Sequence, residues 1–216
     1  ADFYKSYDSI VEHLSEKAVP ISLPIGIESE FNGIVDLVKM NAIIHKDDEG
    51  KVIEVTPVPE NLKAKSQEYR NKLIEIVADS DDIIAEKYLE GKEITGEELQ
   101  AGIRKATLES KLFPVLAGSS LRNKGIQAML DNVCRYLPSP HDKYFNREDK
   151  ETHEEKLYKD EIPGIEPDTD EIVTRKLVDS DPFCGLVFKL AVDPHVGNLA
   201  FFRVYSGKLD AGTYIY

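Results

Sequence analysis

The stretch Phe113-Pro114-Val115-Leu116-Ala117-Gly118-Ser119-Ser120-Leu121-Arg122-Asn123-Lys124-Gly125-Ile126 decides how the middle of this chain folds. Its apolar start predicts a short strand, its Gly-Ser-Ser predicts a turn, and a helical pattern follows at once. Asn123 is a suitable N-cap for that helix, which ends before Pro138. The apolar residues of the helix recur at a spacing that places them on one buried face: Ile126, Met129, Leu130, Val133, Cys134 and Leu137. The stretch therefore predicts a strand, a tight turn and an amphipathic helix.

This strand–turn–helix unit resembles the fifth guanine-nucleotide motif of the translational GTPases, in the form found in bacterial elongation factor G. Members of that family read Gly-Ser-Ala-Leu/Phe-Lys-Asn-Lys-Gly at the turn, and their helix ends in Tyr-Leu-Pro-Ser-Pro, as residues 136–140 do here. The resemblance implies that the turn contacts the guanine base. By position that role falls on four residues: Gly118, Ser119, Ser120 and Leu121. Two residues depart from the family pattern, because Ser120 replaces Ala and Arg122 replaces Lys.

Composition sets broad limits on the kind of protein. The 216 residues allow one large domain or two ordinary ones, and 41% of them are hydrophobic, which is enough for a core. No apolar run approaches a membrane span, and the first residues lack the features of a signal peptide. The net charge of -13 argues against nonspecific nucleic-acid binding and suits either solubility or a basic partner surface. We expect neither a membrane nor DNA as a partner, and we expect Cys134 and Cys184 to be buried, reduced thiols of a cytoplasmic protein.

Several strands and helices are predicted on either side of this region. Residues 1–16 predict an amphipathic helix. Strand patterns follow at residues 19–25, 31–37, 40–45 and 52–55, and they predict a small antiparallel sheet. The first of these strands contains two prolines, which suits the edge of a sheet.

Three helices are predicted between this sheet and the central stretch. The first has one apolar face, which consists of Tyr69, Leu73, Ile76 and Val77. Asp79 and Ser80 are expected to form the cap between it and a second helix at residues 82–89. Thr95 and Glu98 form a capping box that opens the third helix. Its inward-facing residues are predicted to be Leu99, Ile103, Ala106 and Ser110.

Two further stretches resemble elongation factor G. Residues 23–37 resemble the insert subdomain of its GTPase domain, and residues 188–207 resemble the start of its second domain, a β-barrel. The resemblance implies a mixed α/β (α+β) fold: part of a P-loop-GTPase-type domain with a complete insert, followed by part of an antiparallel β-barrel. We expect residues 1–18 and 114–140 to end the GTPase domain, 19–113 to form the insert, 141–181 an acidic linker, and 182–216 the first barrel strands.

Motifs for catalysis are missing. GTP hydrolysis requires a Gly-rich loop with Lys followed by Ser or Thr to hold the phosphates and Mg²⁺, and the Gly-Lys pairs at Gly50, Gly91 and Gly207 lack that residue. The Asp-x-x-Gly match at residues 47–50 fits a hairpin turn better than a switch motif. The five histidines show no zinc motif. We therefore predict that this chain is not an enzyme and binds no metal or cofactor itself; GTP and Mg²⁺ are implied for a longer parent protein.

A stripe of acidic residues recurs at helical spacing: Glu68, Glu75, Asp79, Asp82 and Glu86. Like charges at this spacing repel each other by roughly a few tenths of a kcal/mol per pair, and such stripes are often solvated faces. The resemblance implies a second interpretation, because the insert of elongation factor G faces a basic surface of the acidic ribosomal stalk protein. By position, Glu75, Asp79 and Asp82 are then the docking residues.

Three basic residues stand out in the acidic chain near its C-terminal end: Lys189, Arg203 and Lys208. The resemblance implies that this region contacts small-subunit rRNA, and Lys and Arg bind phosphates. Pairing of Arg203 with an internal acid is the alternative.

Taken together, the three motif-rich stretches imply an internal fragment of a ribosomal translocation factor, which hydrolyses GTP to move tRNA and mRNA. The fragment itself would be a ribosome- and stalk-docking module. Two alternatives stay open: a sister ribosome-binding GTPase of the release-factor or tetracycline-resistance type, and a paralogue that no longer hydrolyses GTP and acts as an interaction module.

Overall fold

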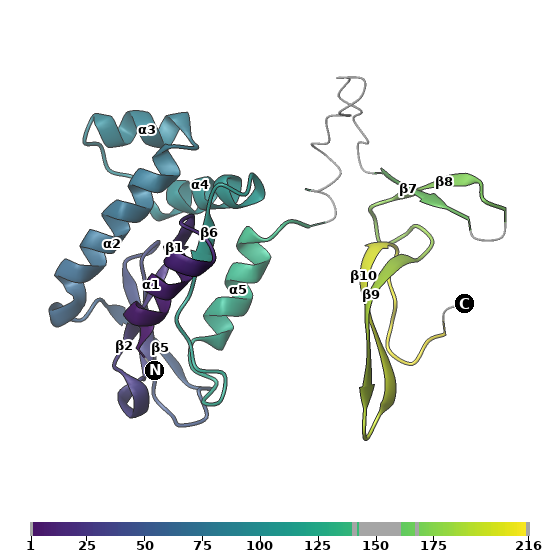
Figure 1. Ribbon diagram of the computed structural model, residues 1–216, viewed down its shortest axis with the longest axis horizontal. Coiled ribbons are helices and arrows are strands. Elements are labelled where there is room, and N and C mark those ends of the chain that lie inside the picture. Colours follow the sequence, from purple (N-terminus) through teal and green to yellow (C-terminus); the bar gives the residue numbers. More distant parts are fainter. Residues whose placement is uncertain (1, 140–141, 143–160, 167–168, 215–216) are drawn as a thin grey trace. The chain divides into compact units, whose positions relative to one another are not determined.

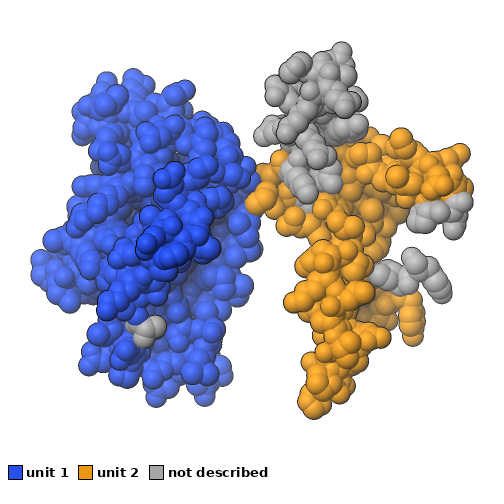
Figure 2. Space-filling view, viewed as in Figure 1, with its two compact units in different colours: residues 1–137 blue, residues 138–216 orange. Residues whose placement is uncertain are grey.

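The computed structural model describes residues 2–139, 142, 161–166 and 169–214, which belong to two compact units (Figure 2). Unit 1 comprises residues 1–137 and unit 2 comprises residues 138–216. Helices and strands are mixed and most strand pairs are antiparallel, so the predicted α+β class is confirmed (Figure 1). No helix in the described residues is both long and apolar enough to cross a membrane.

The strands of unit 1 form two sheets. The larger sheet is antiparallel with the strand order β2 (Ser22–Ile25), β3 (Gly33–Asp36), β4 (Asn41–His45) and β5 (Ile53–Pro57), as the sequence predicts. The smaller sheet pairs β1 (Ala18–Pro20) in parallel with β6 (Phe113–Val115). The single edge strand predicted over residues 19–25 is therefore wrong.

Ile21 explains why this segment divides between the two sheets. Its amide donates to the carbonyl of Val115 (2.9 Å), while its own carbonyl accepts from the amide of Leu37 (3.1 Å). The backbone thus leaves the parallel pair at Ile21 and enters the antiparallel sheet at Ser22. The predicted edge position holds for β2, which is the first strand of its sheet.

The helices of unit 1 are α1 (Phe3–His13), α2 (Glu60–Ala78), α3 (Asp82–Leu89), α4 (Gly96–Leu108) and α5 (Ile126–Tyr136), with a 3₁₀ turn at Glu28–Glu30 (Figure 1). Helices α2, α3 and α4 pack on one another and on the sheet. The main core lies between them and includes the following fully or almost fully buried residues: Leu23, Val35, Leu37, Leu73, Val77, Ile84, Leu99, Ile103 and Leu112.

Two details of these helices differ from the prediction. Asp79 is the C-cap of α2, as the predicted cap between the two helices requires, but the N-cap of α3 is Asp81, whose side chain accepts from the amides of Ile83 (3.1 Å) and Ile84 (3.2 Å). Ser110 is exposed and has a φ of 56°, so it lies beyond the end of α4 and does not face inward. The bounds of α3 are as predicted and only its N-cap residue differs, whereas α4 ends at Leu108, two residues before Ser110.

The apolar stripe of α5 was expected to be buried, and this prediction is wrong for its second half. Leu130, Val133 and Leu137 are 55%, 42% and 50% exposed, and Cys134 is exposed as well. Within unit 1 the core contacts come instead from the side of α5 that carries Ala128 and Tyr136. The periodicity identifies an apolar face correctly, but it does not say whether a neighbouring element covers that face.

The start of α5 also differs. The N-cap is Gly125, whose φ of 80° is left-handed, and the predicted cap Asn123 lies two residues earlier. The side chain of Asn123 donates to the carbonyl of Glu49 (3.2 Å), so it serves the β4–β5 hairpin instead of the helix.

The capping box of α4 is confirmed. The hydroxyl of Thr95 accepts from the amide of Glu98 (3.2 Å), and the carboxylate of Glu98 accepts from the amide of Thr95 (2.9 Å). The same carboxylate forms an ion pair with Lys87 of α3. Glu98 therefore joins α3 to the first turn of α4.

We predict that this junction makes the stability of unit 1 depend on pH. The ion pair with Lys87 and then the amide of Thr95 lower the pKa of Glu98 from 4.5 to about 2. Because the folded pKa is lowered, the ionised carboxylate stabilises the fold above pH 4.5, and this stabilisation is lost as the pH falls through about 2. Urea unfolding between pH 6 and pH 2 should show a smaller loss of stability for Glu98→Gln than for wild type, since Gln keeps the capping box but not the charge.

Glu97→Gln is the matched control, because Glu97 is exposed in the same helical turn. Its pH dependence should follow that of wild type. If the free energy of unfolding of Glu98→Gln falls with pH as steeply as that of wild type down to pH 2, the ion pair with Lys87 contributes nothing to the pH dependence of stability.

Unit 2 contains two hairpins in its described residues. β7 (Glu161–Ile165) pairs with β8 (Ile172–Lys176), and β9 (Cys184–Asp193) pairs with β10 (Gly197–Ser206), both antiparallel. The hydroxyl of the buried Ser206 donates to the carbonyl of Lys176 (2.6 Å) and joins the two hairpins.

Some of the predictions for unit 2 are confirmed and others are wrong. Two long strands, β9 and β10, lie within residues 182–216, where the first barrel strands are predicted, whereas Thr213 and Tyr214 form no strand and residues 215–216 lie outside the described residues. Part of the predicted linker, residues 161–165 and 172–176, forms the β7–β8 hairpin and is not an irregular connection. Residues 141, 143–160 and 167–168 of that linker lie outside the described residues. The four predicted domain boundaries stay predictions.

Candidate functional site

The predicted base-contacting turn is a closed loop between β6 and α5. The amide of Ser119 donates to the carbonyl of Lys124 (2.8 Å), and the amide of Lys124 donates back to the carbonyl of Ser119 (3.1 Å). Between this pair, Ser120, Leu121 and Arg122 are exposed, and Leu121 is 95% exposed. The amide of Ser119 is used inside the loop, and the carbonyl of Ser120 accepts from the amide of Asn123 (3.2 Å), so the backbone amides of Ser120 and Leu121 are the groups that could contact a base.

A hollow lies beside one end of this turn. It is lined by residues of α1, of the loop after β2 and of the turn: Asp2, Phe3, Ser6, Pro24, Gly26, Ile27, Glu28, Phe31, Leu116, Ala117, Gly118 and Ser119. The structure thus brings Gly118 and Ser119 to a surface that includes two aromatic rings, while Ser120 and Leu121 do not line it. A flat, partly apolar group fits the chemistry of this wall, so the residues are compatible with a purine base. Their role in binding one stays a prediction.

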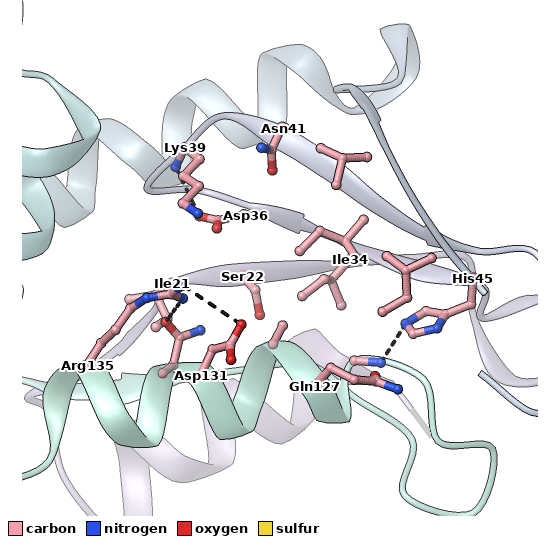
Figure 3. A pocket seen from close by; sticks show the side chains of 16 residues that line it. Ile21, Ser22, Ile34, Asp36, Lys39, Asn41, His45, Gln127, Asp131 and Arg135 are labelled. Atoms are coloured by element: carbon pink, nitrogen blue, oxygen red, sulfur yellow. Dashed lines mark hydrogen bonds and ion pairs between the residues drawn. The ribbon is translucent and has the colours of Figure 1, made fainter. Parts of the chain in front are cut away.

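A second hollow lies between the β2–β5 sheet and α5, as Figure 3 shows. Ile34 and Ile43 of the sheet form an apolar floor, and Arg135 of α5 stands at one end near Asp131 (3.8 Å). His45 lies at the other end, where it meets the backbone at Gly125. None of the predicted site residues lines this hollow.

The acidic stripe falls on the outer sides of α2 and α3. We define the acidic face as Glu75, Asp79, Asp82 and Glu86, all of which are exposed. None of these four carboxylates forms an ion pair within the described part of the chain. Glu68, the fifth residue of the stripe, forms an i,i+4 pair with Lys72 (2.7 Å) and is therefore partly neutralised. The bend between α2 and α3 leaves Glu75 and Asp79 on one helix segment and Asp82 and Glu86 on the next.

Two apolar residues on α3 were not singled out by the sequence. Ile83 is 67% exposed and Leu89 is 84% exposed, whereas Ile84 of the same helix is buried. Ile83 is next to Asp82 in the sequence and three residues from Glu86. The only sequence signal for them was their position outside the apolar face of α3.

The three basic residues predicted to contact rRNA, Lys189, Arg203 and Lys208, are all exposed. Lys189 of β9 is the cross-strand partner of Phe201 in β10, and its Nζ lies 5.4 Å from the centroid of that ring. Arg203 follows Phe201 two residues along β10, past a register shift of the hairpin between Phe201 and Phe202. One of its nitrogens is 3.4 Å from the carbonyl of Pro138, so it contacts a backbone oxygen and not an acid at this point. Lys208 follows β10.

The cysteines do not match the expectation of buried thiols. Cys134 is exposed and Cys184 is half-buried, and both are free. Within the described residues, no group of three or more His, Cys, Asp or Glu side chains is arranged to hold a metal ion.

The C-terminal segment of the chain matches a known protein family. Residues 182–216 match the family model described as elongation factor G domain 2. This segment is similar to the second domain of elongation factor G. The matched segment contains β9, β10 and all three of the basic residues described above.

A solved structure extends the similarity beyond that segment. The crystal structure of a protein from Thermus thermophilus is similar over 99% of this chain, with a TM-score of 0.64 and 25% sequence identity. The likeness therefore includes unit 1 as well as unit 2. The chain covers 26% of the length of the Thermus protein, so it corresponds to about a quarter of that protein.

Proposed function

We propose that this chain is part of a ribosome-binding translation factor of the elongation factor G type, acting in the cytoplasm. The longer protein would hydrolyse GTP with Mg²⁺ to move tRNA and mRNA on the ribosome. The domain 2 match over residues 182–216 and the closed turn at Ser119–Lys124 support this assignment. The chain alone would not hydrolyse GTP, because its sequence has no phosphate-binding loop. Its own contribution would be to dock on the ribosome.

The acidic face is the proposed docking site for the ribosomal stalk. Its four exposed carboxylates lack an ion-pair partner in the described part of the chain, so their charge is available to a partner with a basic surface. This single observation carries the docking proposal. Charge pairs at the rim of an interface act mainly on the association rate and make binding sensitive to salt.

The basic residues of unit 2 are the proposed contact with small-subunit rRNA. Lys189 is the cross-strand partner of Phe201 in the β9–β10 hairpin, Arg203 follows Phe201 two residues along β10, and Lys208 follows the hairpin. Cationic groups in this arrangement bind phosphates, and an aromatic ring near them can stack on a base.

We predict that reversing the charge of the acidic face weakens stalk binding. The isolated C-terminal domain of the stalk protein is titrated with this chain, at low and at physiological salt. The variant carrying Glu75→Lys, Asp79→Lys and Asp82→Lys should bind about tenfold more weakly or worse at low salt, because each reversal replaces an attraction by a repulsion. Wild-type affinity should fall as salt rises.

The matched control carries Asp8→Lys, Glu12→Lys and Glu16→Lys, three exposed positions in or just after α1. It changes the net charge by the same amount and should keep most of the affinity. Equal loss in both variants would show a nonspecific charge effect. No binding by the folded wild-type chain at low salt would return the acidic face to an ordinary solvated surface.

A further inference from the structure

The tip of the β4–β5 hairpin and the turn before α5 are far apart in the sequence but are joined by hydrogen bonds. We call them the hairpin tip, residues 47–50, and the turn, residues 118–125. We propose that the hairpin tip and His45 are a positioning device for the turn, holding the exposed backbone of Ser120 and Leu121 in one geometry. That this backbone meets a guanine base rests on the proposed function; the positioning itself does not.

His45 is the central link. Its ring is buried, with 4% of the residue exposed. Nε2 accepts from the amide of Gly125 (2.9 Å), and Nδ1 lies 3.2 Å from the carbonyl of Gly50. An amide can only donate and a carbonyl can only accept, so the ring must be neutral with its proton on Nδ1. One side chain thereby joins the end of the turn to the end of the hairpin tip.

Gly50 allows the two segments to come this close. Its carbonyl accepts a second hydrogen bond, from the side chain of Gln127 (2.9 Å). A Cβ at Gly50 would lie 2.3 Å from the carbonyl oxygen of Asn123, and the φ of 68° is also left-handed. Only glycine fits such a backbone approach without displacing the turn.

The neighbouring residues add bonds on both sides. Asn123 donates from its side chain to the carbonyl of Glu49 (3.2 Å). On the opposite side of the turn, Arg122 donates to the carbonyl of Ser29 (2.9 Å) in the 3₁₀ turn after β2. The turn is therefore held between two loops of the adjacent sheet.

The hairpin tip is closed by its own hydrogen bonds. The carboxylate of Asp47 accepts from the amides of Val52 (2.8 Å) and Lys51 (3.2 Å), which closes the tip. This also explains the Asp-x-x-Gly match at residues 47–50, since Asp47 caps a hairpin and Gly50 supplies its left-handed residue.

Fixing the ends of a loop has a direct effect on ligand contact. Ser120 and Leu121 are exposed and lie between the bonded pair Ser119 and Lys124. When the ends are held in advance, less conformational entropy is lost as a ligand contacts the middle. The hairpin tip would thus influence how Ser120 and Leu121 bind a ligand, without contacting that ligand itself.

The test uses amide hydrogen exchange measured by NMR on the whole chain. His45→Phe keeps a planar ring but removes both hydrogen bonds, and His45→Gln keeps one donor and one acceptor. We expect exchange at Lys124 and Gly125 to become at least about tenfold faster in His45→Phe and to be partly restored in His45→Gln. Exchange at Leu23 and Val35 in the core should change much less. His13→Phe, at an exposed position in α1, is the control.

Two spectroscopic readouts separate this inference from the proposed function. Nitrogen-15 shifts of the His45 ring should show the Nδ1–H tautomer. Guanosine, added to the wild-type chain, should shift the amides of Ser120 and Leu121, and the shifts should weaken in His45→Phe. If exchange responds to His45→Phe but guanosine shifts nothing, the positioning device stands and the base contact is wrong.

Unchanged exchange at Lys124 and Gly125 in a folded His45→Phe variant would overturn the inference. If that variant does not fold, Gln127→Met replaces it, since it removes one bond to Gly50 and leaves the ring in place. The same amides should then exchange faster, and a wild-type exchange pattern would again overturn the inference.

Discussion

Replacing Leu99 with alanine is expected to lower the free energy of unfolding of unit 1 by about 3–4 kcal/mol. Leu99 is fully buried in α4 and belongs to the core that α2, α3 and α4 share with the sheet. Removing three side-chain carbon atoms loses apolar burial and leaves a cavity that the surrounding helices fill only in part. Neighbouring Leu73 and Val77 on α2 are also fully buried, so little room exists for the core to collapse.

Urea unfolding followed by far-UV circular dichroism measures this effect, because the helices named above belong to unit 1. The control is Leu89→Ala, since Leu89 is 84% exposed on α3. It should change the free energy of unfolding by no more than about 0.5 kcal/mol. Similar changes in both variants would contradict the position of the core.

Replacing Arg70 with methionine is expected to lower the free energy of unfolding of unit 1 by about 2–4 kcal/mol. The Arg70 guanidinium donates to the carbonyls of Leu37 (2.6 Å), Val38 (2.6 Å) and Ile94 (3.0 Å). These carbonyls belong to two separate loops, one after β3 and one before α4, so a single side chain joins both loops to α2. Burial lowers the pKa of Arg70, while the nearby Asp36 and Glu93 raise it, and the group remains a charged donor.

The conservative variant sharpens the test of Arg70. Arg70→Lys has a single nitrogen and cannot reach all of the carbonyls in the planar arrangement of a guanidinium, so its stability should lie between wild type and Arg70→Met. Lys63→Met is the control, because Lys63 forms an exposed ion pair with Glu60 on the surface of the same helix (2.5 Å). If Arg70→Met is as stable as Lys63→Met, the hydrogen bonds of Arg70 to the two loops do not stabilise the fold.

Local patterns in the sequence predicted much of the secondary structure. The span of α3 from residue 82 to residue 89, the Thr95–Glu98 capping box and the antiparallel sheet are confirmed. Each depends on residues close together in the chain, such as an N-terminal cap or an alternating strand. The resemblance of residues 188–207 to elongation factor G is supported by the domain 2 match over residues 182–216.

Other features required contacts between distant segments. No pattern near His45 indicates that its ring accepts from Gly125, 80 residues later in the chain. From the sequence, Arg70 is likewise indistinguishable from an ordinary surface charge on α2. Only the structure shows that its guanidinium donates to the carbonyls of Leu37 and Ile94. Burial of a polar side chain follows from what packs against it, and the local sequence does not contain that information.

The sequence by itself thus determined the fold class, the similarity of residues 182–216 to elongation factor G domain 2 and the acidic composition of the stripe on α2 and α3, because these follow from local periodicity and motifs. The tertiary structure alone decided which carboxylates of that stripe stay unpaired among the described residues, that the second half of the α5 stripe is exposed, and that residues 47–50 support the turn at residues 118–125. These depend on which surfaces of distant segments meet, and hydrogen bonds and packing across them are set only when the chain has folded.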